Sequence, residues 1–136
     1  MRVHTGRANR GATLIEFALI AVLMMLVIFA SFEFGRMLLV YSSIANAAHV
    51  ACRYAITHGG SNSQAATLDE IRTVAKNFAG TAPLNIANLR ITVSPTPPLG
   101  APGSTVSVTV TYPYDPFTIL PLTVTLGSTS QGVITF

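Results

Sequence analysis

Carboxylates and histidines that could transfer protons are sparse in the C-terminal part of this 136-residue chain: His58, Asp69, Glu70 and Asp115. Asp69 and Glu70 fall in the first turn of a predicted helix, where the helix dipole favours carboxylates without any catalytic role. Asp115 lies between two proline residues in a predicted turn. The sequence has no glycine-rich phosphate loop, nucleophile elbow or metal-ligand cluster. We therefore expect a protein without catalytic activity and without a cofactor.

Cys52 and His49 are three residues apart, so on a helix they share a face and could bind a metal ion together with further ligands. No second pair of this kind is present, and His58 lies about two turns past His49. A small thiol packed in a core is the simpler interpretation. As the only cysteine, Cys52 cannot form an intramolecular disulfide, and a disulfide between molecules would need an oxidising compartment.

Glu16 is the one ionisable residue in the apolar run from Ala12 to Phe32, which contains neither glycine nor proline. About 20 helical residues span the hydrocarbon core of a bilayer, so the length of this run predicts a membrane-spanning helix. A carboxylate inside a membrane is costly and indicates a function. The alternative is that Glu16 lies near the interface and reaches water, and both interpretations stay open.

Three arginine residues, Arg2, Arg7 and Arg10, precede the apolar run without any acidic residue among them. Their three positive charges equal the net charge of the whole chain, +3. The rest of the chain therefore has no excess of positive charge, and no basic surface that would bind nucleic acid is expected. The positive-inside rule places the N-terminus in the cytoplasm and the chain beyond Phe32 across the membrane. A secretory signal peptide also begins with basic residues, but its apolar region is only about 7–15 residues long and ends at small residues.

The end of this basic leader resembles the processing site of type IV prepilins. Gly11 is followed by Ala12, and Glu16 is the fifth residue counted from Ala12, with Phe17 after it. A glycine lets an extended backbone enter a protease cleft without steric obstruction. The resemblance implies that a membrane-embedded prepilin peptidase cuts between Gly11 and Ala12.

A closer resemblance covers nearly the whole chain. The segments Glu33-Phe34-Gly35-Arg36, Asn46-Ala47-Ala48 and Cys52-Arg53-Tyr54-Ala55 are similar to the TadE-like family. Its members are minor pilins or pseudopilins of tight-adherence (Tad/Flp) pilus systems. The chain departs from the family pattern at His49-Val50 and at Cys52. These positions lie in the stalk, the part of the predicted long helix beyond the membrane. The departures therefore bear on contacts of the stalk with partner proteins and not on the processing site.

Apolar residues continue past Arg36 at spacings of three and four, which predicts one helix from Ala12 to about Thr57. Its apolar face is expected to contain Met37, Tyr41, Ile44, Ala48, Cys52 and Ala55, and its polar face Ser42, Asn46, His49 and Arg53. Glu33 and Arg36 are spaced to form an ion pair. Gly35 between them suits a bend or a close helix contact, with an ordinary turn at the membrane edge as the alternative.

Residues 58–63 are expected to form a loop, followed by a second helix that begins at a Thr67–Glu70 capping box or near Ser63 and ends at Gly80. Its predicted apolar face consists of Leu68, Ile71, Val74, Ala75 and Phe78. The hydrophobic period then changes to two, which predicts strands at residues 89–93 and 106–112, joined by a proline-rich loop that returns the chain antiparallel. The segment 112–117 is expected to end the second strand, and 117–122 is an apolar segment between prolines. Val124–Phe136 supplies a last strand, bent at Gly127 or Gly132.

These elements predict an α+β fold with a long N-terminal helix, a second helix and a small antiparallel sheet of three or four strands. The sheet's apolar side is expected to be covered by the stalk or by the helix from about Ser63 to Ala79. We expect three parts: a leader (1–11), a transmembrane and stalk helix (12–58), and a periplasmic or extracellular α+β domain (59–136).

The family resemblance implies a non-catalytic minor pilin or pseudopilin that is a structural or assembly subunit of the pilus. It would be a single-pass protein of the bacterial inner membrane, with incorporation into the extracellular pilus left open. The implied partners are the lipid bilayer, the prepilin peptidase, other pilin-like subunits and the pilus assembly machinery. Glu16, Glu33, Gly35 and Arg36 are the residues expected to mediate helix packing and assembly. The alternative is an uncleaved membrane-anchored binding domain.

Overall fold

The computed structural model describes residues 8–59, 65–80, 82–97, 99–116 and 123–135. The chain forms two compact units, Met1–Gly35 and Arg36–Phe136. Helix α1 (Ala8–Thr57) contributes its first part to the first unit and residues 36–57 to the second. The other elements belong to the second unit: α2 (Leu68–Ala79), the 3-10 helix η1 (Ile86–Asn88), β1 (Arg90–Ser94), β2 (Thr105–Tyr114) and β3 (Val124–Val133). The α+β fold predicted from the sequence is confirmed.

Helix α1 runs without interruption to Thr57, as expected, but it begins at Ala8 rather than at Ala12. The four residues ahead of Ala12 contain no proline, and a glycine such as Gly11 costs a helix only about 1 kcal/mol relative to alanine. The basic leader therefore does not end the helix. The leader residues 1–7, which include Arg2 and Arg7, lie outside the described residues. The same holds for residues 60–64, which include most of the predicted loop, and for the apolar segment 117–122.

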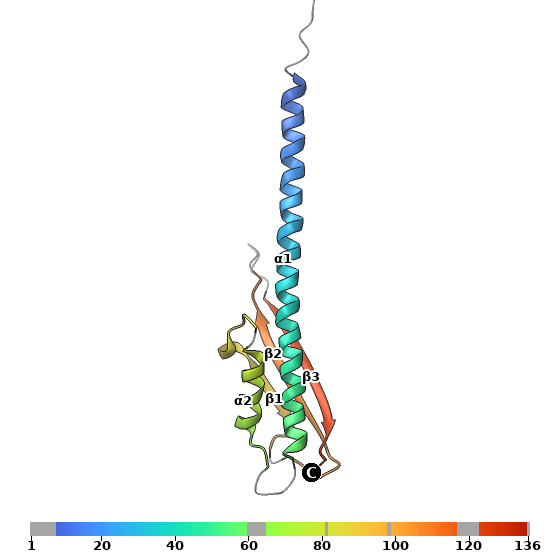
Figure 1. Cartoon of the computed structure of the whole chain (residues 1–136), viewed down its shortest axis with the longest axis vertical. Helices are drawn as coiled ribbons and strands as arrows, with labels where there is room; N and C mark the ends of the chain where they lie inside the picture. The colour runs from blue at the N-terminus through green and yellow to red at the C-terminus, as the bar shows by residue number, and fades with distance from the viewer. Residues whose placement is uncertain (1–7, 60–64, 81, 98, 117–122, 136) are drawn as a thin grey trace, which may run out of the picture. The chain divides into compact units, whose positions relative to one another are not determined.

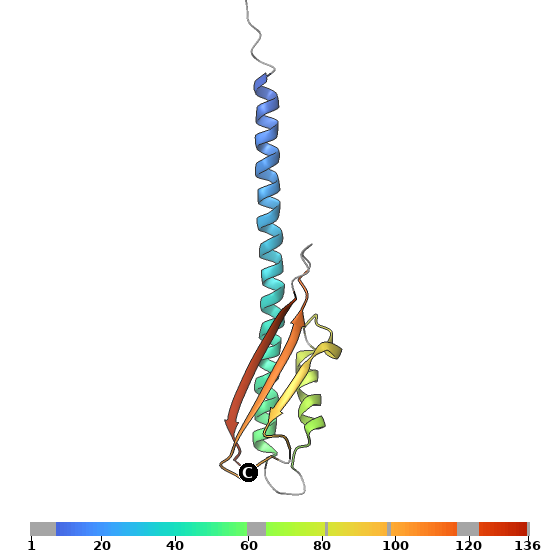
Figure 2. The same cartoon turned by 180° about the vertical axis from the view of Figure 1, so that it is seen from behind.

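The three strands form one antiparallel sheet in the order β1-β2-β3 (Figure 2). The predicted alternation is confirmed, because Ile91 and Val93 of β1 and Val106, Val108 and Val110 of β2 are buried on one face. The final strand is β3, which continues through both Gly127 and Gly132. A Cβ atom built at Gly132 would clash with the side chain of Ile56, so this glycine allows α1 and β3 to approach closely.

Strand β2 ends at Tyr114, inside the segment 112–117 that was expected to end it, and therefore runs through Pro113. The backbone N–H of Ile134 donates to the carbonyl of Ser104 (2.9 Å), and hydrogen-bonded pairs alternate along an antiparallel ladder. Ser104 and Ile134 therefore form a hydrogen-bonded pair, and every second pair along β2 and β3 is hydrogen-bonded in the same way. By this alternation, the pair of Pro113 with Thr125 is one without hydrogen bonds between the two strands. A proline there removes no bond to β3, so the strand can run through it.

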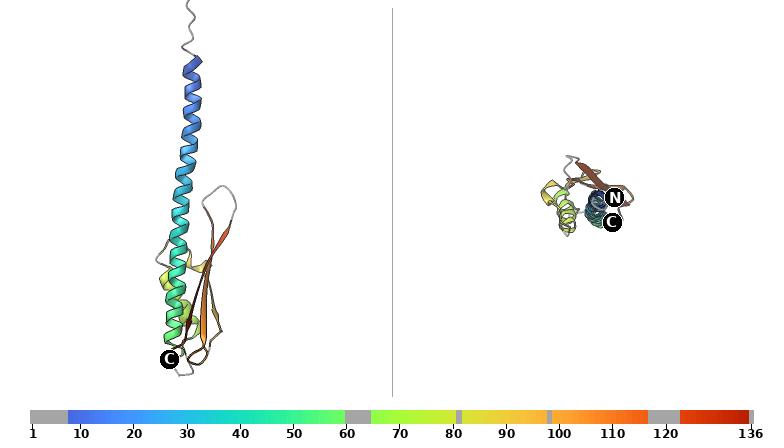
Figure 3. Two further views of the ribbon diagram at one scale, coloured as in Figure 1. Left: turned by 90° about the vertical axis from the view of Figure 1, so that its right-hand side faces the viewer. Right: turned by 90° about the horizontal axis from the view of Figure 1, so that it is seen from above.

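Both helices of the second unit cover the same face of the sheet, as the side and end views show (Figure 3). The core combines small residues of α1, one stripe of α2 and the inward side chains of the strands. It contains Val40, Ile44, Ala47, Ala48, Ala51, Cys52, Ala55, Ala66, Ile71, Ala75, Ala79, Leu89, Ile91, Val93, Leu99, Val106, Val108, Val110, Tyr114 and Ile134. The sequence left open which helix covers the sheet, and the structure uses both.

Two residues predicted to lie on apolar helix faces are exposed, Tyr41 by 44% and Phe78 by 43%. Strands β2 and β3 cross the second half of α1 obliquely (Figure 1), so the buried stripe moves around the helix along its length. Val40 therefore takes the buried place expected of Tyr41. On α2 the buried residues are Ile71, Ala75 and Ala79, four residues apart, which leaves Phe78 on the flank.

The start of α2 is the predicted capping box, and the alternative start near Ser63 is wrong. The backbone N–H of Glu70 donates to the Thr67 hydroxyl (3.3 Å), and the backbone N–H of Thr67 donates to the Glu70 carboxylate (2.9 Å). The bond from the Thr67 backbone lowers the pKa of Glu70. Gly80 ends the helix, and its N–H donates to the Lys76 carbonyl (2.9 Å).

Replacing Thr67 with alanine is expected to destabilise the second unit by about 1 kcal/mol, the usual effect of losing an N-cap. Because the pKa of Glu70 is lowered on folding, its stabilisation is complete above the ordinary value of 4.5 and is lost as the pH falls through the folded value. Urea unfolding of Thr67→Ala and of wild type at pH 7 and pH 3 measures both effects. A Thr73→Ala variant, which loses only the hydroxyl bond to the Asp69 carbonyl, is the control. A Glu70→Ala variant that is destabilised equally at both pH values would show that the Glu70 carboxylate contributes no pH-dependent stability.

Candidate functional site

The residues of the predicted processing site lie at the start of α1. Gly11 and Ala12 are both helical and both exposed, so the helix that was predicted to begin at Ala12 already includes Gly11. In the described part of the chain, one helical turn, Ala8–Gly11, precedes the bond between Gly11 and Ala12. The first four N–H groups of any helix have no partner within the helix, so this turn opens at low cost. A peptidase would have to unwind that turn before cutting.

Glu16 lies one turn beyond Ala12, on the same side of the helix and about 6 Å further along its axis. Its side chain is exposed, and Phe17 beside it is 70% exposed. The structure thus brings Ala12 and Glu16 within one turn, as their spacing predicted. A charged group at the new N-terminus of a cleaved chain would lie near this carboxylate.

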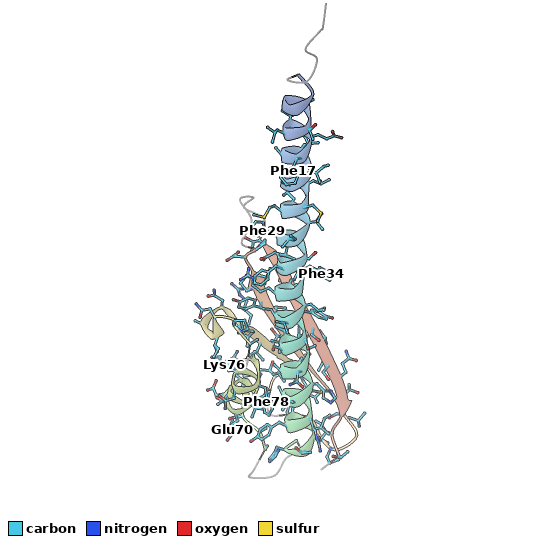
Figure 4. The ribbon with its side chains drawn as sticks, turned by 45° about the horizontal axis from the view of Figure 1, so that its top comes forward. Phe17, Phe29, Phe34, Glu70, Lys76 and Phe78 are labelled. Atoms are coloured by element: carbon cyan, nitrogen blue, oxygen red, sulfur yellow. The ribbon has the colours of Figure 1, made fainter. Side chains whose placement is uncertain are left out.

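The rest of the first unit exposes apolar side chains on every side of α1, including Phe17, Phe29 and Phe34 (Figure 4). Their exposed fractions range from 52% at Ile20 to 73% at Phe32. A helix that is apolar all round needs lipid or protein around it. In the described part of the chain, one helix, near the N-terminus, is long and apolar enough to cross a membrane. This suggests a single-pass membrane protein.

Gly35 ends the first unit and has open space beside it. A Cβ atom built there meets nothing within 4 Å in the described part of the chain. A larger side chain would therefore not disturb the fold of a single molecule. If a helix of another subunit packs closely at this position, the same side chain would keep the two apart.

We expect Gly35→Leu to leave the fold intact and to weaken assembly. Leucine is also a better helix former than glycine by about 0.8–1 kcal/mol, so the variant should be no less stable than wild type. Co-purification from membranes with the partner subunits that the family resemblance implies measures assembly, and circular dichroism measures the fold. Gly35→Ala is the matched control with a smaller side chain. Normal recovery of partners with Gly35→Leu would show that Gly35 is no helix contact.

Arg36 opens the second unit and contacts the end of β2. Its guanidinium carbon lies 4.8 Å from the ring centre of Tyr114, and its Nη2 donates to the backbone carbonyl of Asp115 (2.9 Å). The Tyr114 ring is only 3% exposed. Arg36 thereby fastens α1 to the sheet, a role that sequence analysis missed because Asp115 is 79 positions away. The ion pair between Glu33 and Arg36 stays a prediction.

The candidate acid–base groups each have a structural place. The ring of His58 stacks on Tyr54 (4.2 Å between centroids), and its Nδ1 lies 3.0 Å from the Thr57 hydroxyl. Asp69 lies 3.5 Å from Arg72 on the surface of α2. Glu70 belongs to the helix cap. Of these groups, His58 and Glu70 come close enough for the charge of His58 to contribute, after the Thr67 hydrogen bonds, to the lowered pKa of Glu70.

His49 and Cys52 do not face one another as metal ligands would. Cys52 is buried in the core with 1% exposure, as expected of a packed thiol, whereas His49 is on the exposed face of α1. The described residues contain no group of three or more histidine, cysteine, aspartate or glutamate side chains that could hold a metal ion.

The family model of TadE-like proteins matches residues 11–53. The match confirms the resemblance to this family over a segment that contains the predicted processing site, the apolar part of α1 and Gly35. No curated protein and no solved structure matches the chain.

Proposed function

We propose that the protein is a non-catalytic minor pilin or pseudopilin that helps to assemble a tight-adherence pilus at the bacterial inner membrane. The observation that carries this proposal is the family match at residues 11–53, which includes the part of α1 up to Gly35 whose apolar side chains are exposed all round. The N-terminus lies in the cytoplasm and the α+β unit on the other side of the membrane. In the bilayer, the apolar part of α1 packs against helices of other pilin-like subunits.

Glu16 has a specific part in this assembly. Cleavage after Gly11 creates an α-amino group on Ala12 that is largely protonated at pH 7. A central charge in a membrane costs about 2.5–3.5 kcal/mol on insertion scales, and pairing Glu16 with an amino group lowers that cost. When the amino group belongs to a neighbouring subunit, the pair also fixes the axial register of the two helices. A shifted register would leave both charges without a partner.

The proposal for Glu16 is tested by substitution. We expect Glu16→Ala and Glu16→Gln to insert into the membrane as wild type does, because both remove a costly charge. Both should recover several-fold less of the partner subunits in pull-downs from detergent-solubilised membranes. Ser31→Ala is the control, since it also replaces a polar residue of the same helix. The Ser31 hydroxyl donates to the Val27 carbonyl one turn earlier (2.8 Å). Full recovery of partners with both Glu16 variants would assign Glu16 to the membrane interface, with no role in assembly.

A second candidate function is a membrane-anchored binding domain that is never cleaved. The continuation of α1 back to Ala8 favours it, because the proposed scissile bond then lies within a helix. The mature N-terminus separates the two functions. A chain that begins at Ala12 in cells with the cognate prepilin peptidase supports the pilin, and a chain that keeps its leader supports the anchor.

A further inference from the structure

Strand β3 forms one edge of the sheet, and no described strand pairs with its outer side (Figure 2). The ladder fixed by the bond from Ile134 to Ser104 shows which backbone groups point outward. Hydrogen-bonded pairs with β2 fall on the even-numbered residues of β3, from Val124 to Gly132. The N–H and C=O groups of the odd-numbered residues therefore point away from β2. These are the groups of Thr125, Gly127, Thr129, Gln131 and Val133, which we call the free edge.

The two edges of the sheet are protected differently against a further strand. Strand β1 has five residues, begins with Arg90 and is followed at once by Pro95, all of which discourage pairing. Strand β3 has ten residues and contains neither a charged residue nor a proline. Proteins that keep an edge closed normally place such residues on it. The free edge of β3 is thus a template for strand addition.

Gly127 indicates what kind of strand would fit. It is exposed on the outer face of the sheet, opposite Thr111, whose methyl carbon lies 3.2 Å from a Cβ built at Gly127. A glycine in an edge strand leaves a bare stretch of backbone that an aromatic side chain on the neighbouring strand covers well. The absence of charge along β3 favours an uncharged strand, since a charged side chain there would meet no counter-charge.

We propose that the free edge of β3 binds an extended, uncharged segment of another protein, which pairs with β3 as a further strand and places an aromatic side chain over Gly127. The two edge strands of a second copy do not meet these requirements, because neither β1 nor β3 contains an aromatic residue. Strand addition at β3 does not depend on cleavage after Gly11. A failure of strand addition is therefore distinguishable from a failure of the proposed cleavage and pilin function.

Backbone amide exchange of the full chain in detergent micelles, followed by NMR, tests this proposal. The probe is a capped peptide, Thr-Val-Thr-Tyr-Thr-Val-Thr, and its control has glycine in place of the tyrosine. In the free chain, exchange at the free edge should be fast and exchange at the even-numbered residues of β3 slow. The tyrosine peptide at about ten times its Kd should slow exchange at the free edge about tenfold, by mass action. The glycine peptide should have a weaker effect at the same concentration.

Two variants at one position provide the control in the protein. Gln131→Pro removes an outward N–H that β2 does not use, and Gln131→Ala keeps it. We expect both to retain the exchange pattern of the even-numbered residues, and only Gln131→Pro to lose peptide binding. Three results would overturn the proposal: no slowing by the tyrosine peptide, equal slowing by the glycine peptide, or slowing at the free edge with protein concentration alone, which would indicate a second copy.

Discussion

Gly11→Leu is expected to abolish removal of the leader, so that the variant keeps Met1 while the unmodified protein begins at Ala12. A peptidase must draw the backbone around Gly11 out of its helical turn and into a narrow cleft, and a leucine side chain obstructs that step. The substitution should not harm the protein itself, because nothing in the described part of the chain lies within 4 Å of a Cβ at Gly11. Intact mass of the protein made together with its cognate prepilin peptidase gives the answer directly.

Gly35→Leu is the matched control for this experiment. It makes the same replacement in the same helix, also at a glycine with open space, but far from the scissile bond. The control should be processed to Ala12 as completely as the unmodified protein. If the unmodified protein also keeps Met1 under these conditions, the cleavage proposal fails and the uncleaved anchor is the better account. If Gly11→Leu is processed normally, a glycine at this position is not required.

Most of the secondary structure followed from local patterns in the sequence. The long apolar run with its 3.6-residue period gave α1, and the Thr67–Glu70 spacing gave the start of α2. The alternation of valine with serine and threonine gave β2 and its buried face. In each case the sequence pattern and the structure that it predicts involve the same residues, which lie within a few positions of one another in the chain.

The features that sequence could not predict depend on contacts between distant segments. Whether Pro113 ends β2 depends on which of its neighbours bond to β3, and this is set by the register with Thr125. The partner of Arg36 is the end of that same strand, which only folding brings to α1. For the candidate site, the spacing of Ala12 and Glu16 was correctly read as one helical turn. The helical state of Gly11 was missed because the helix was predicted to begin at Ala12, where the apolar run begins.

The burial of Ile44 and the exposure of Tyr41 give the sharpest test of the second unit. Both were expected on one apolar face, but Ile44 is 0% exposed and Tyr41 is 44% exposed. Ile44→Ala should destabilise the unit by about 2–5 kcal/mol, because it removes buried methyl groups and leaves a cavity under the sheet. Tyr41→Ala should change the stability by no more than about 0.5 kcal/mol, as is usual for a surface position.

The measurement is urea unfolding of the full chain in detergent micelles, followed by near-ultraviolet circular dichroism. This signal reports on the tyrosines, including the buried ring of Tyr114, and does not depend on the helix that remains in the micelle. The unfolding midpoint of Ile44→Ala should fall well below that of wild type, with an unchanged slope. The midpoint of Tyr41→Ala should stay close to wild type. Equal losses in the two variants would mean that Tyr41 is packed as the sequence pattern predicted and that the sheet does not cross α1 obliquely.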